Sequence, residues 1–225
     1  MKVAIIPARG GSKRIPNKNI RIFNGNPIIF YSIKAAIDSM CFDRVIVSTD
    51  DTKISKIAKS LGAEVPFVRP EEISDDFSGI IPVLKHTIQW LEKEGFKPDY
   101  FCCIYATAPF VTAVDIQSIF KQIQINNSDY CIAVSKFTYP IQRALQIKDG
   151  MISMLNLDFF NSRSQDLDEY YHDAGQLFCG KCSALLKDIP IFLGSTSYYI
   201  KPQHLVQDID TIEDWHRAEI LYKLL

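Results

Sequence analysis

The amino-terminal stretch combines a short apolar run with a loop rich in glycine and cations. Residues 3–6 read VAII, an uninterrupted apolar run of the kind that a strand buried in a parallel sheet requires. Pro7 has no N–H with which to extend a ladder of hydrogen bonds, so we expect the strand to end there. The next twelve residues, ARGGSKRIPNKN (8–19), contain two glycines and four cations. The chain is therefore predicted to open on a buried strand whose carboxyl end carries this loop.

The loop has the composition of a phosphate-binding loop. Gly10 and Gly11 let a ligand approach the backbone, and the successive N–H groups up to Ser12 are expected to form a concavity for an anion. Arg9 offers a planar fork for phosphate oxygens, and Lys18 offers a compact charge. The glycine spacing fits neither G-x-x-x-x-G-K-[ST] nor G-x-G-x-x-G, which argues against a P-loop and against a NAD-linked oxidoreductase. A solvated basic turn is the alternative, but open α/β sheets bind ligands beyond the carboxyl ends of their strands, which favours a polyphosphate site.

Hydrophobic periodicity alternates between strands and helices up to residue 135. Strand-like runs occur at 3–6, 44–49, 64–68, 100–105 and 130–135, and amphipathic helical stretches at 27–37, 52–61, 82–93 and 114–125. This rhythm predicts an α/β fold with a doubly wound, mostly parallel, Rossmann-like sheet and right-handed crossovers. A strand near 176–180 and a helix at 211–224 complete a single domain, residues 1–225. Residues 136–170 show no βα unit, and a lid over the site is one interpretation, because long loops in compact domains are usually functional.

Charge is unevenly distributed along the chain, although the net charge is −1. The first 37 residues carry seven cations and no acidic residue, which suits a small polyanionic ligand. No basic amphipathic helix is present, so we expect no nucleic-acid partner. No signal peptide, transmembrane run or lipidation motif is visible, so we expect no membrane partner. The six cysteines lie mostly in apolar runs and indicate the reduced thiols of a cytoplasmic protein.

Asp208 and Asp210 form the second chemically informative feature. At the end of a strand, residues two apart share a face, so both carboxylates are expected to point one way and Ile209 inward. Two carboxylates that close repel each other unless a cation lies between them, and Mg²⁺ is commonly held by one or two carboxylates together with substrate phosphates. The alternative is that Asp210 or Thr211 caps the last helix, with an acidic residue of the first turn completing a capping box. Capping leaves Asp208 unexplained, and we therefore expect a metal site.

Seven short blocks of the sequence resemble a known family, the CMP-sugar synthetases or cytidylyltransferases that activate nonulosonic acids of the sialic acid group. In family order, the blocks are ARGGSKRIPNKN (8–19), FDRVIVSTDD (42–51), RPEEISDD (69–76), YATAP (105–109), SRSQDL (162–167), YHDAGQ (171–176) and DIDTIEDW (208–215). The resemblance implies a fold of the nucleotide-diphospho-sugar transferase type, with a small dimerisation excursion at 136–170 and hence a homodimer. It implies that CTP and a nonulosonic acid give a CMP-sugar and pyrophosphate, with Mg²⁺ as the cofactor on Asp208 and Asp210.

The resemblance also assigns residues to the two substrates. On the CTP side these are Ala8, Arg9, Gly10, Gly11, Ser12, Lys18, Asn19, Arg69 and Ser78. The base would be read by the last three of them, and the alternative for Arg69 is a surface ion pair with Glu71 or Glu72. On the sugar side the assigned residues are Tyr105, Thr107, Gln142, Arg143, Arg163, Gln165, His172, Asp173 and Gln176. Catalysis would rest on positioning and charge neutralisation by Arg9, Lys18, Asp208 and Asp210, and Arg163 would clamp the sugar carboxylate.

Two blocks distinguish between branches of this family. HDAGQ (172–176) stands where the sialic acid enzymes carry RPNGA, and YPIQR (139–143) stands where they carry a lysine. Both blocks are similar to the pseudaminic acid branch, which implies pseudaminic acid as the sugar, activated for surface glycans or flagellin. Sialic acid, legionaminic acid and 3-deoxy-octulosonate are the alternative sugars. A catalytically silent nucleotide-binding protein is the alternative from another class, but such a relative should have lost one of the four catalytic residues.

Overall fold

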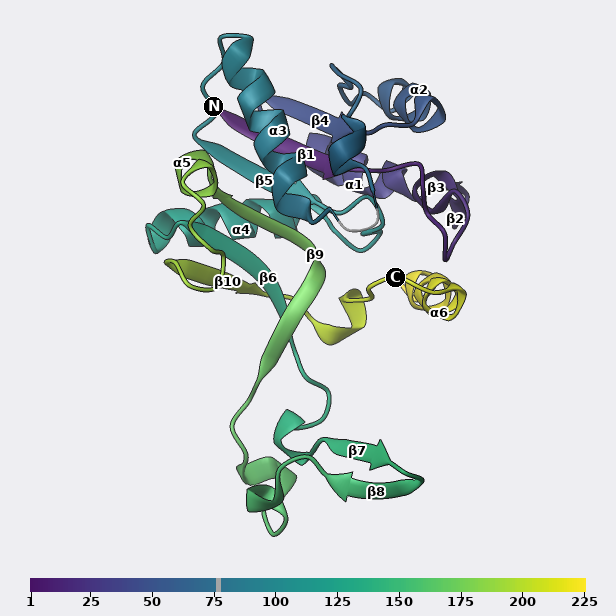
Figure 1. Ribbon diagram of the computed structural model, residues 1–225, viewed down its shortest axis with the longest axis vertical. Helices are drawn as coiled ribbons and strands as arrows, with labels where there is room; N and C mark the ends of the chain where they lie inside the picture. Colours follow the sequence, from purple (N-terminus) through teal and green to yellow (C-terminus); the bar gives the residue numbers. More distant parts are fainter. Residues whose placement is uncertain (76–77) are drawn as a thin grey trace.

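Six strands form one sheet in the order β10–β6–β9–β5–β1–β4. The computed structural model describes residues 1–75 and 78–225 (Figure 1). The strands are β1 (Lys2–Pro7), β4 (Arg44–Ser48), β5 (Tyr100–Ile104), β6 (Tyr130–Lys136), β9 (Tyr171–Lys181) and β10 (Thr196–Ile200). β1 pairs in parallel with β4 and β5, and β10 pairs in parallel with β6, whereas β9 runs antiparallel to both of its neighbours. The predicted α/β fold with a mostly parallel sheet is therefore confirmed.

Helices cover both faces of the sheet (Figure 1). One face packs against α1 (Ile29–Asp38), α2 (Thr52–Ser60) and α4 (Ala113–Ile125). The other face packs against α3 (Ile80–Lys93) and α5 (Cys182–Leu186). At one end of the sheet, α6 (Ile212–Tyr222) packs on the short hairpin of β2 (Ile22–Phe23) and β3 (Asn26–Pro27).

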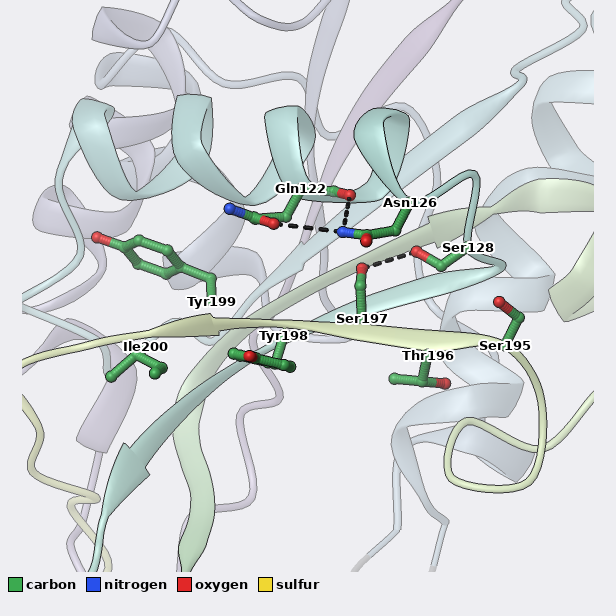
Figure 2. Close-up of a pocket in the computed structure, with 9 residues that line it drawn as sticks. All are labelled: Gln122, Asn126, Ser128, Ser195, Thr196, Ser197, Tyr198, Tyr199 and Ile200. Atoms are coloured by element: carbon green, nitrogen blue, oxygen red, sulfur yellow. Dashed lines mark hydrogen bonds between the residues drawn. The ribbon is translucent and has the colours of Figure 1, made fainter. Parts of the chain in front are cut away.

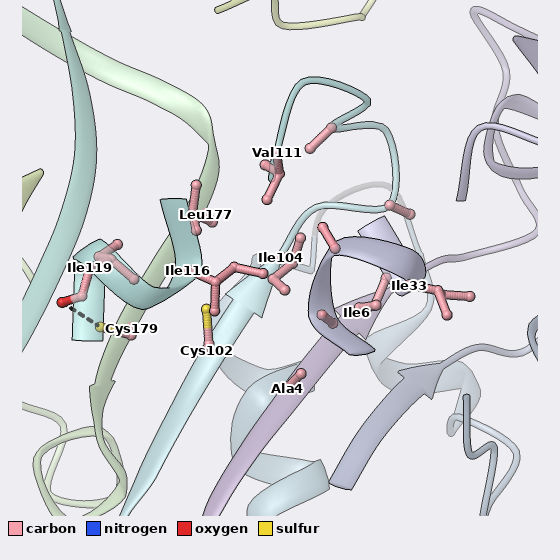
Figure 3. Packing of buried hydrophobic residues seen from close by; sticks show 14 of the residues in the cluster. Ala4, Ile6, Ile33, Cys102, Ile104, Val111, Ile116, Ile119, Leu177 and Cys179 are labelled. Carbon is pink, nitrogen blue, oxygen red and sulfur yellow. Dashed lines mark hydrogen bonds between the residues drawn. The ribbon is translucent and has the colours of Figure 1, made fainter. Parts of the chain in front are cut away.

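Alternate residues of the same strands build the two cores. In β1, Ala4 and Ile6 belong to the core under α1 and α4, and Val3 and Ile5 to the core under α3. Figure 3 shows the first of these cores, in which Ile33 of α1 lies close to β1. Because both faces of the strand are buried, each of the four residues is apolar, and the sequence shows a continuous run instead of alternation.

Residues 137–170, which we call the arm, leave the sheet between β6 and β9 and project away from the helices (Figure 1). The arm contains the hairpin of β7 (Leu145–Lys148) and β8 (Met151–Met154). Its remaining elements are the short 3₁₀ turns η3 (Ile141–Arg143), η4 (Leu157–Phe159) and η5 (Ser164–Asp166). As expected from the sequence, the arm has no βα unit.

Local structure departs from the sequence-based expectation at several places. The strand expected at 64–68 is reduced to one bridge between Glu64 and Ile46, because Pro66 has no N–H for the next ladder bond. Pro27 pairs in β3 instead of beginning the first helix. β9 begins at Tyr171, earlier than the strand expected near 176. Asp76, which ends the acidic block 69–76, lies outside the described residues.

The remaining short turns are η1 (Lys18–Ile20), η2 (Glu71–Ile73) and η6 (Gln203–Leu205). Within residues 1–75 and 78–225, no helix is both long enough and apolar enough to cross a membrane.

Gly180 offers a test of how tightly the core under α3 is packed. A Cβ at this position in β9 would lie 2.5 Å from Cδ1 of Tyr130 and 2.8 Å from Cε1 of Phe101. Both aromatic side chains are fully buried and cannot move aside. We expect Gly180→Ala to lower the free energy of unfolding by about 1–3 kcal/mol, measured by urea titration. Gly11→Ala is the matched control, because a Cβ there meets nothing within 4 Å, and equal stability of the two variants would contradict the packing argument.

Candidate functional site

A cleft with a volume of about 440 Å³ opens beyond the carboxyl ends of β1 and β5. Its walls come from the glycine-rich loop, from η2 and the start of α3, and from the loop that follows β5. Nine residues expected from the sequence line it: Arg9, Ser12, Lys18, Asn19, Arg69, Ser78, Tyr105, Thr107 and Asp210. The structure therefore places the glycine-rich loop at a cleft rather than on an open surface.

A second cavity of about 420 Å³, which we call the acidic pocket, adjoins the cleft. It is lined by Lys18, Tyr105, Thr107, Asp173, Gly175, Asp208 and Asp210. Four of these residues, namely Lys18, Tyr105, Thr107 and Asp210, line both cavities. The basic loop from the start of the chain and the aspartate couplet near its end thus meet at one continuous site.

The aspartate couplet lies in the loop before α6 and not at the end of a strand. The argument that the two carboxylates share one face of a strand therefore does not apply. Ile209 nevertheless points inward as expected, because it is fully buried in a cluster with Phe110 and Trp215. The loop is fixed at its carboxyl end by a capping box between Thr211 and Asp214. Capping of α6 is therefore the task of these two residues, and Asp208 and Asp210 are left to line the acidic pocket.

Two cations of the glycine-rich loop already contact Asp210. Lys18 Nζ donates to the carbonyl oxygen of Ile209 at 2.6 Å and lies 3.3 Å from Asp210 Oδ1. Arg14 Nη1 lies 3.1 Å from Asp210 Oδ2. In the part of the chain that the structure describes, Asp208 has no such ion pair. Burial, and then the charge of Asp210, raise the pKa of Asp208 above its ordinary value.

The chemistry of this donor set fits a hard divalent cation. Asp208 and Asp210 offer carboxylate oxygens to one pocket, where burial and then the charge of Asp210 raise the pKa of Asp208. A cation between them would remove this repulsion. Protonation of Asp208 at lower pH would also remove this repulsion.

The backbone of the glycine-rich loop differs from the expected open anion nest. Gly10 N–H donates to Asp50 Oδ1 at 2.9 Å, and Ser12 N–H donates to the Gly10 carbonyl at 3.0 Å. A Cβ on Gly10 would lie 2.9 Å from Cβ of Asp51, which caps α2. Gly10 is therefore required for close packing against α2, and two of the three amides expected to bind phosphate are occupied by acceptors of the chain. Ala8 is also buried and provides only backbone.

Arg69 and Asn19 line the cleft but not the acidic pocket, and both are buried. Arg69 is 5% exposed, its Nη2 donates to the Ser48 carbonyl, and its Nε is buried without a hydrogen-bond partner. Burial lowers the pKa of Arg69 to about 10. The surface ion pair with Glu71 or Glu72 is absent among the described residues. An unpaired buried donor on a cleft wall indicates that a ligand acceptor completes this site.

Asn19 supports the same wall, since its Nδ2 donates to the Arg9 carbonyl at 2.9 Å. Ser78 lies at the mouth of the cleft, where its N–H donates to Asp75 Oδ1 at 2.6 Å. Arg9 Nη1 donates to the Asp75 carbonyl and so joins the glycine-rich loop to the segment after η2.

Residues assigned to the sugar separate into three groups. Tyr105, Thr107 and Asp173 line the acidic pocket as expected. Gln176 does not, because its side chain is fully buried and its Nε2 donates to the Leu205 carbonyl at 2.9 Å. Its Oε1 is buried without a hydrogen-bond partner, and its assignment to the sugar stays a prediction. His172 packs edge-to-face against Phe137 at the root of the arm, with 5.0 Å between ring centroids.

The third group lies on the arm and is not brought to the cleft of the same chain (Figure 1). Gln142 Nε2 donates to the Asp168 carbonyl at 2.9 Å, and Arg143 Nη1 donates to the Ser162 carbonyl at 2.7 Å. Arg163 Nε donates to Asp166 Oδ2 at 2.8 Å, and Gln165 is exposed. Their polar groups serve the arm itself in the isolated chain.

Gly175 and Arg14 are site residues that the sequence analysis did not select. Gly175 has φ +63°, and a Cβ there would lie 3.6 Å from Cβ and Cγ of Asp208, so the bulge in β9 supports that carboxylate. Asp173 Oδ1 accepts the Gly175 N–H at 2.8 Å and fixes the bulge. Gly175 lies just before the strand predicted near 176–180, so the rule that a glycine inside a strand commonly marks a bulge did not select it.

A further cavity of about 490 Å³ lies between α4 and β10, away from the predicted site (Figure 2). Its walls carry hydroxyl and amide groups, several of which are already paired, such as Ser128 with Ser197 at 2.7 Å. None of the residues expected from the sequence lines it. The cleft and the acidic pocket are therefore the candidate site.

Comparison with known proteins agrees with this geometry. Residues 3–174 match a family model described as cytidylyltransferase. A pseudaminic acid cytidylyltransferase of Campylobacter jejuni is 42% identical over 223 residues, which is 99% of this chain and 96% of the relative. An N-acylneuraminate cytidylyltransferase of Escherichia coli is 30% identical over 96% of this chain and 51% of the relative.

A solved structure of CMP:2-keto-3-deoxy-manno-octonic acid synthetase, complexed with CTP, superposes with a TM-score of 0.73. The superposition covers 99% of this chain and 98% of that chain at 15% identity, so it shows a shared fold. The family model spans three quarters of the chain, from β1 through the arm to the bulge of β9. The chain therefore belongs to the cytidylyltransferase family.

Proposed function

We propose that this protein transfers the cytidylyl group of CTP to pseudaminic acid, forming CMP-pseudaminic acid and releasing pyrophosphate. The observation that carries the reaction type is the meeting of the basic loop and the aspartate couplet at one cleft. The sugar rests on the 42% identity to the Campylobacter jejuni pseudaminic acid enzyme over almost the whole chain. N-acylneuraminate cytidylyltransferases match at 30–34%, and a CMP-N,N′-diacetyllegionaminic acid synthase matches at 28%.

The cleft suits CTP because its lining combines buried hydrogen-bonding groups with several cations. Arg69, with its unpaired Nε, and Asn19 would face the base, whose carbonyl and ring nitrogen are acceptors. Arg9, Arg14 and Lys18 would hold the triphosphate. Two of these cations contact Asp210 in the unliganded chain, and phosphate oxygens would compete for them. Gly11 and a rearranged Ser12 would supply backbone donors.

Asp208 and Asp210 would hold Mg²⁺ at the acidic pocket. When bound, the ion would neutralise phosphate charge and favour ionisation of the attacking hydroxyl. The sugar hydroxyl forms a bond to the α-phosphorus while the bond to the leaving pyrophosphate breaks, so the protein has to align the two groups and stabilise charge. Arg9 and Lys18 would stabilise the departing pyrophosphate.

The sugar would occupy the acidic pocket beside Tyr105, Thr107 and Asp173. Burial, followed by nearby negative charge, raises the pKa of Tyr105, so its hydroxyl stays protonated and can donate a hydrogen bond at neutral pH. Asp173 is an acceptor for a hydroxyl or N–H of the sugar. The lining of the pocket would therefore offer the sugar both a hydrogen-bond donor and a hydrogen-bond acceptor.

We further propose that the protein is a homodimer whose arm packs on a second copy. The arm exposes many large apolar side chains for its size, for example Ile147 at 79%, Met151 at 75% and Leu157 at 71%. Exposed apolar surface on this scale is typical of an interaction site. In such a dimer Gln142, Arg143, Arg163 and Gln165 could reach a sugar in the partner's cleft.

The free thiols of all six cysteines suit a cytoplasmic location.

The sugar assignment can be tested with a panel of nonulosonic acids. With CTP and Mg²⁺, we expect pyrophosphate release from pseudaminic acid to exceed that from sialic or legionaminic acid, by as much as ~10⁴-fold where buried polar groups are left unpaired. The measurement is kcat/KM by a coupled pyrophosphate assay. Preference for another sugar would overturn the sugar assignment, and release from none of them would overturn the reaction.

The metal site can be tested with Asp208→Asn and Asp210→Asn. Each keeps the shape of the side chain but removes a charge that holds the cation, so we expect kcat to fall on the order of 10²–10³-fold. Circular dichroism should show a folded protein. Asp43→Asn is the matched control, because Asp43 binds the Lys2 N–H at the opposite end of β1. Full activity of either couplet variant would remove the metal argument.

The dimer can be tested by the mass of the protein in solution. At micromolar concentration, sedimentation should give twice the chain mass, and Ile147→Glu combined with Met151→Glu should shift the protein towards monomer. The same pair should reduce activity if the arm completes the partner's site. A wild-type monomer with full activity would favour the lid interpretation instead.

A further inference from the structure

Lys201, at the end of β10, is a fully buried cation outside the site described above. Its side chain is 0% exposed, and Nζ donates to the Phe110 carbonyl at 2.7 Å and to Asp115 Oδ2 at 2.6 Å. Its backbone is fixed as well, because its N–H donates to the Val134 carbonyl at 2.8 Å and its carbonyl accepts from Ser135 Oγ at 3.2 Å.

Asp115 is held in place from several sides. It completes the capping box of α4 with Thr112, whose N–H lies 2.8 Å from Oδ2. Tyr199 Oη donates to Oδ1 at 2.8 Å. Burial alone would raise the pKa of Asp115, but the charge and hydrogen bonds of Lys201 reverse this, so the pKa lies below its usual value. Burial lowers the pKa of Lys201, against the charge and hydrogen bond of Asp115, which raise it. The 2.6 Å contact makes the two groups an ion pair, and among the described residues Lys201 is the cation paired with this carboxylate.

Lys201 connects two of the segments that line the acidic pocket. One is the loop after β5, which carries Tyr105 and Thr107 and which Lys201 grips at the Phe110 carbonyl. The other is the segment that starts at Lys201 itself and leads to the aspartate couplet. The Phe110 side chain packs in the same buried cluster as Ile209, the residue between the two aspartates. The buried cluster therefore connects the loop after β5 to the residue that lies between the two carboxylates.

Stability by itself does not account for this arrangement. Desolvation of two buried charges can exceed their attraction, and an apolar pair of similar volume is often as stable. A charged pair with further hydrogen bonds instead fixes geometry, because each bond is directional. The contacts of Lys201 restrain a carbonyl, a helix terminus and a strand end at once.

We propose that Lys201 is a positioning residue for cytidylyl transfer, holding the aspartate couplet in register with the loop after β5. The inference rests on the proposed function, since it assumes that the couplet binds the metal. It predicts that loss of the ammonium affects the metal and the chemical step, whereas the nucleotide wall formed by Arg69 and Asn19 is left intact.

Two variants separate positioning from stability. Lys201→Met removes the charge and leaves Asp115 buried without its cation, so we expect lower stability. Lys201→Met with Asp115→Asn removes both charges while an oxygen remains to cap α4, so we expect thermal stability to return towards wild type. In both variants we expect kcat to fall on the order of 10–10²-fold, the half-saturating Mg²⁺ concentration to rise several-fold, and KM for CTP to change less than threefold.

Lys181→Met is the matched control, because Lys181 also contacts an aspartate, Asp129 at 3.5 Å, and a carbonyl, Asn127 at 3.0 Å, near the other end of the sheet. It should keep wild-type kcat and Mg²⁺ dependence. A double variant with restored stability and wild-type kcat would overturn the proposal and leave Lys201 a structural residue. An equal rise of KM for CTP in both Lys201 variants, with kcat unchanged, would also overturn it.

A second readout does not depend on turnover. In amide hydrogen exchange, residues 205–211 of the stable double variant should exchange faster than in wild type, while β1 and β5 should remain protected. Unchanged exchange in that segment would contradict the positioning role. A wild-type protein that is inactive with every sugar would instead refute the proposed reaction, and the exchange result would still decide whether Lys201 orders the loop.

Discussion

The contact between Lys18 and the loop before α6 holds the candidate site together. One ammonium group donates to the Ile209 carbonyl at 2.6 Å and lies 3.3 Å from Asp210 Oδ1, which joins segments 191 residues apart. Arg14 makes a second contact with the couplet, at 3.1 Å from Asp210 Oδ2. Opposite charges therefore line one cavity, in which Lys18 and Arg14 are paired with Asp210.

The charges of the site are arranged so that the substrates can complete them. Asp208 has an elevated pKa because it is buried and lies near Asp210, and Arg69 has a lowered pKa because it is buried and lies near Arg9. Burial makes the charged form of each group less favourable than it would be in water. A cation at the couplet and an acceptor at Arg69 would relieve both, which is a physical reason for nucleotide and metal to bind together.

The fold supports the loops that line the cleft and the acidic pocket. β1 and β5 are buried on both faces, and the residues that follow them form the floor of the cleft. The bulge at Gly175 supports Asp208, the capping box at Thr211 fixes the other end of the loop, and Lys201 holds its start. Three separate elements therefore orient one pair of carboxylates.

The sequence by itself determined the class of fold and most of the chemistry. Apolar runs at β1, β5 and β6 predicted the sheet because strands buried on both faces cannot alternate, and the glycine-rich loop and the aspartate couplet stood out by charge and spacing. Tertiary structure decided what depends on distant partners. In the folded chain the Gly10 amide donates to Asp50, and the Gln176 side chain is buried. The couplet lies in a loop, and the arm lies apart from the cleft. Spacing along a chain reports periodicity, whereas hydrogen-bond partners and burial are set by residues far away in sequence, and only the folded chain brings these together.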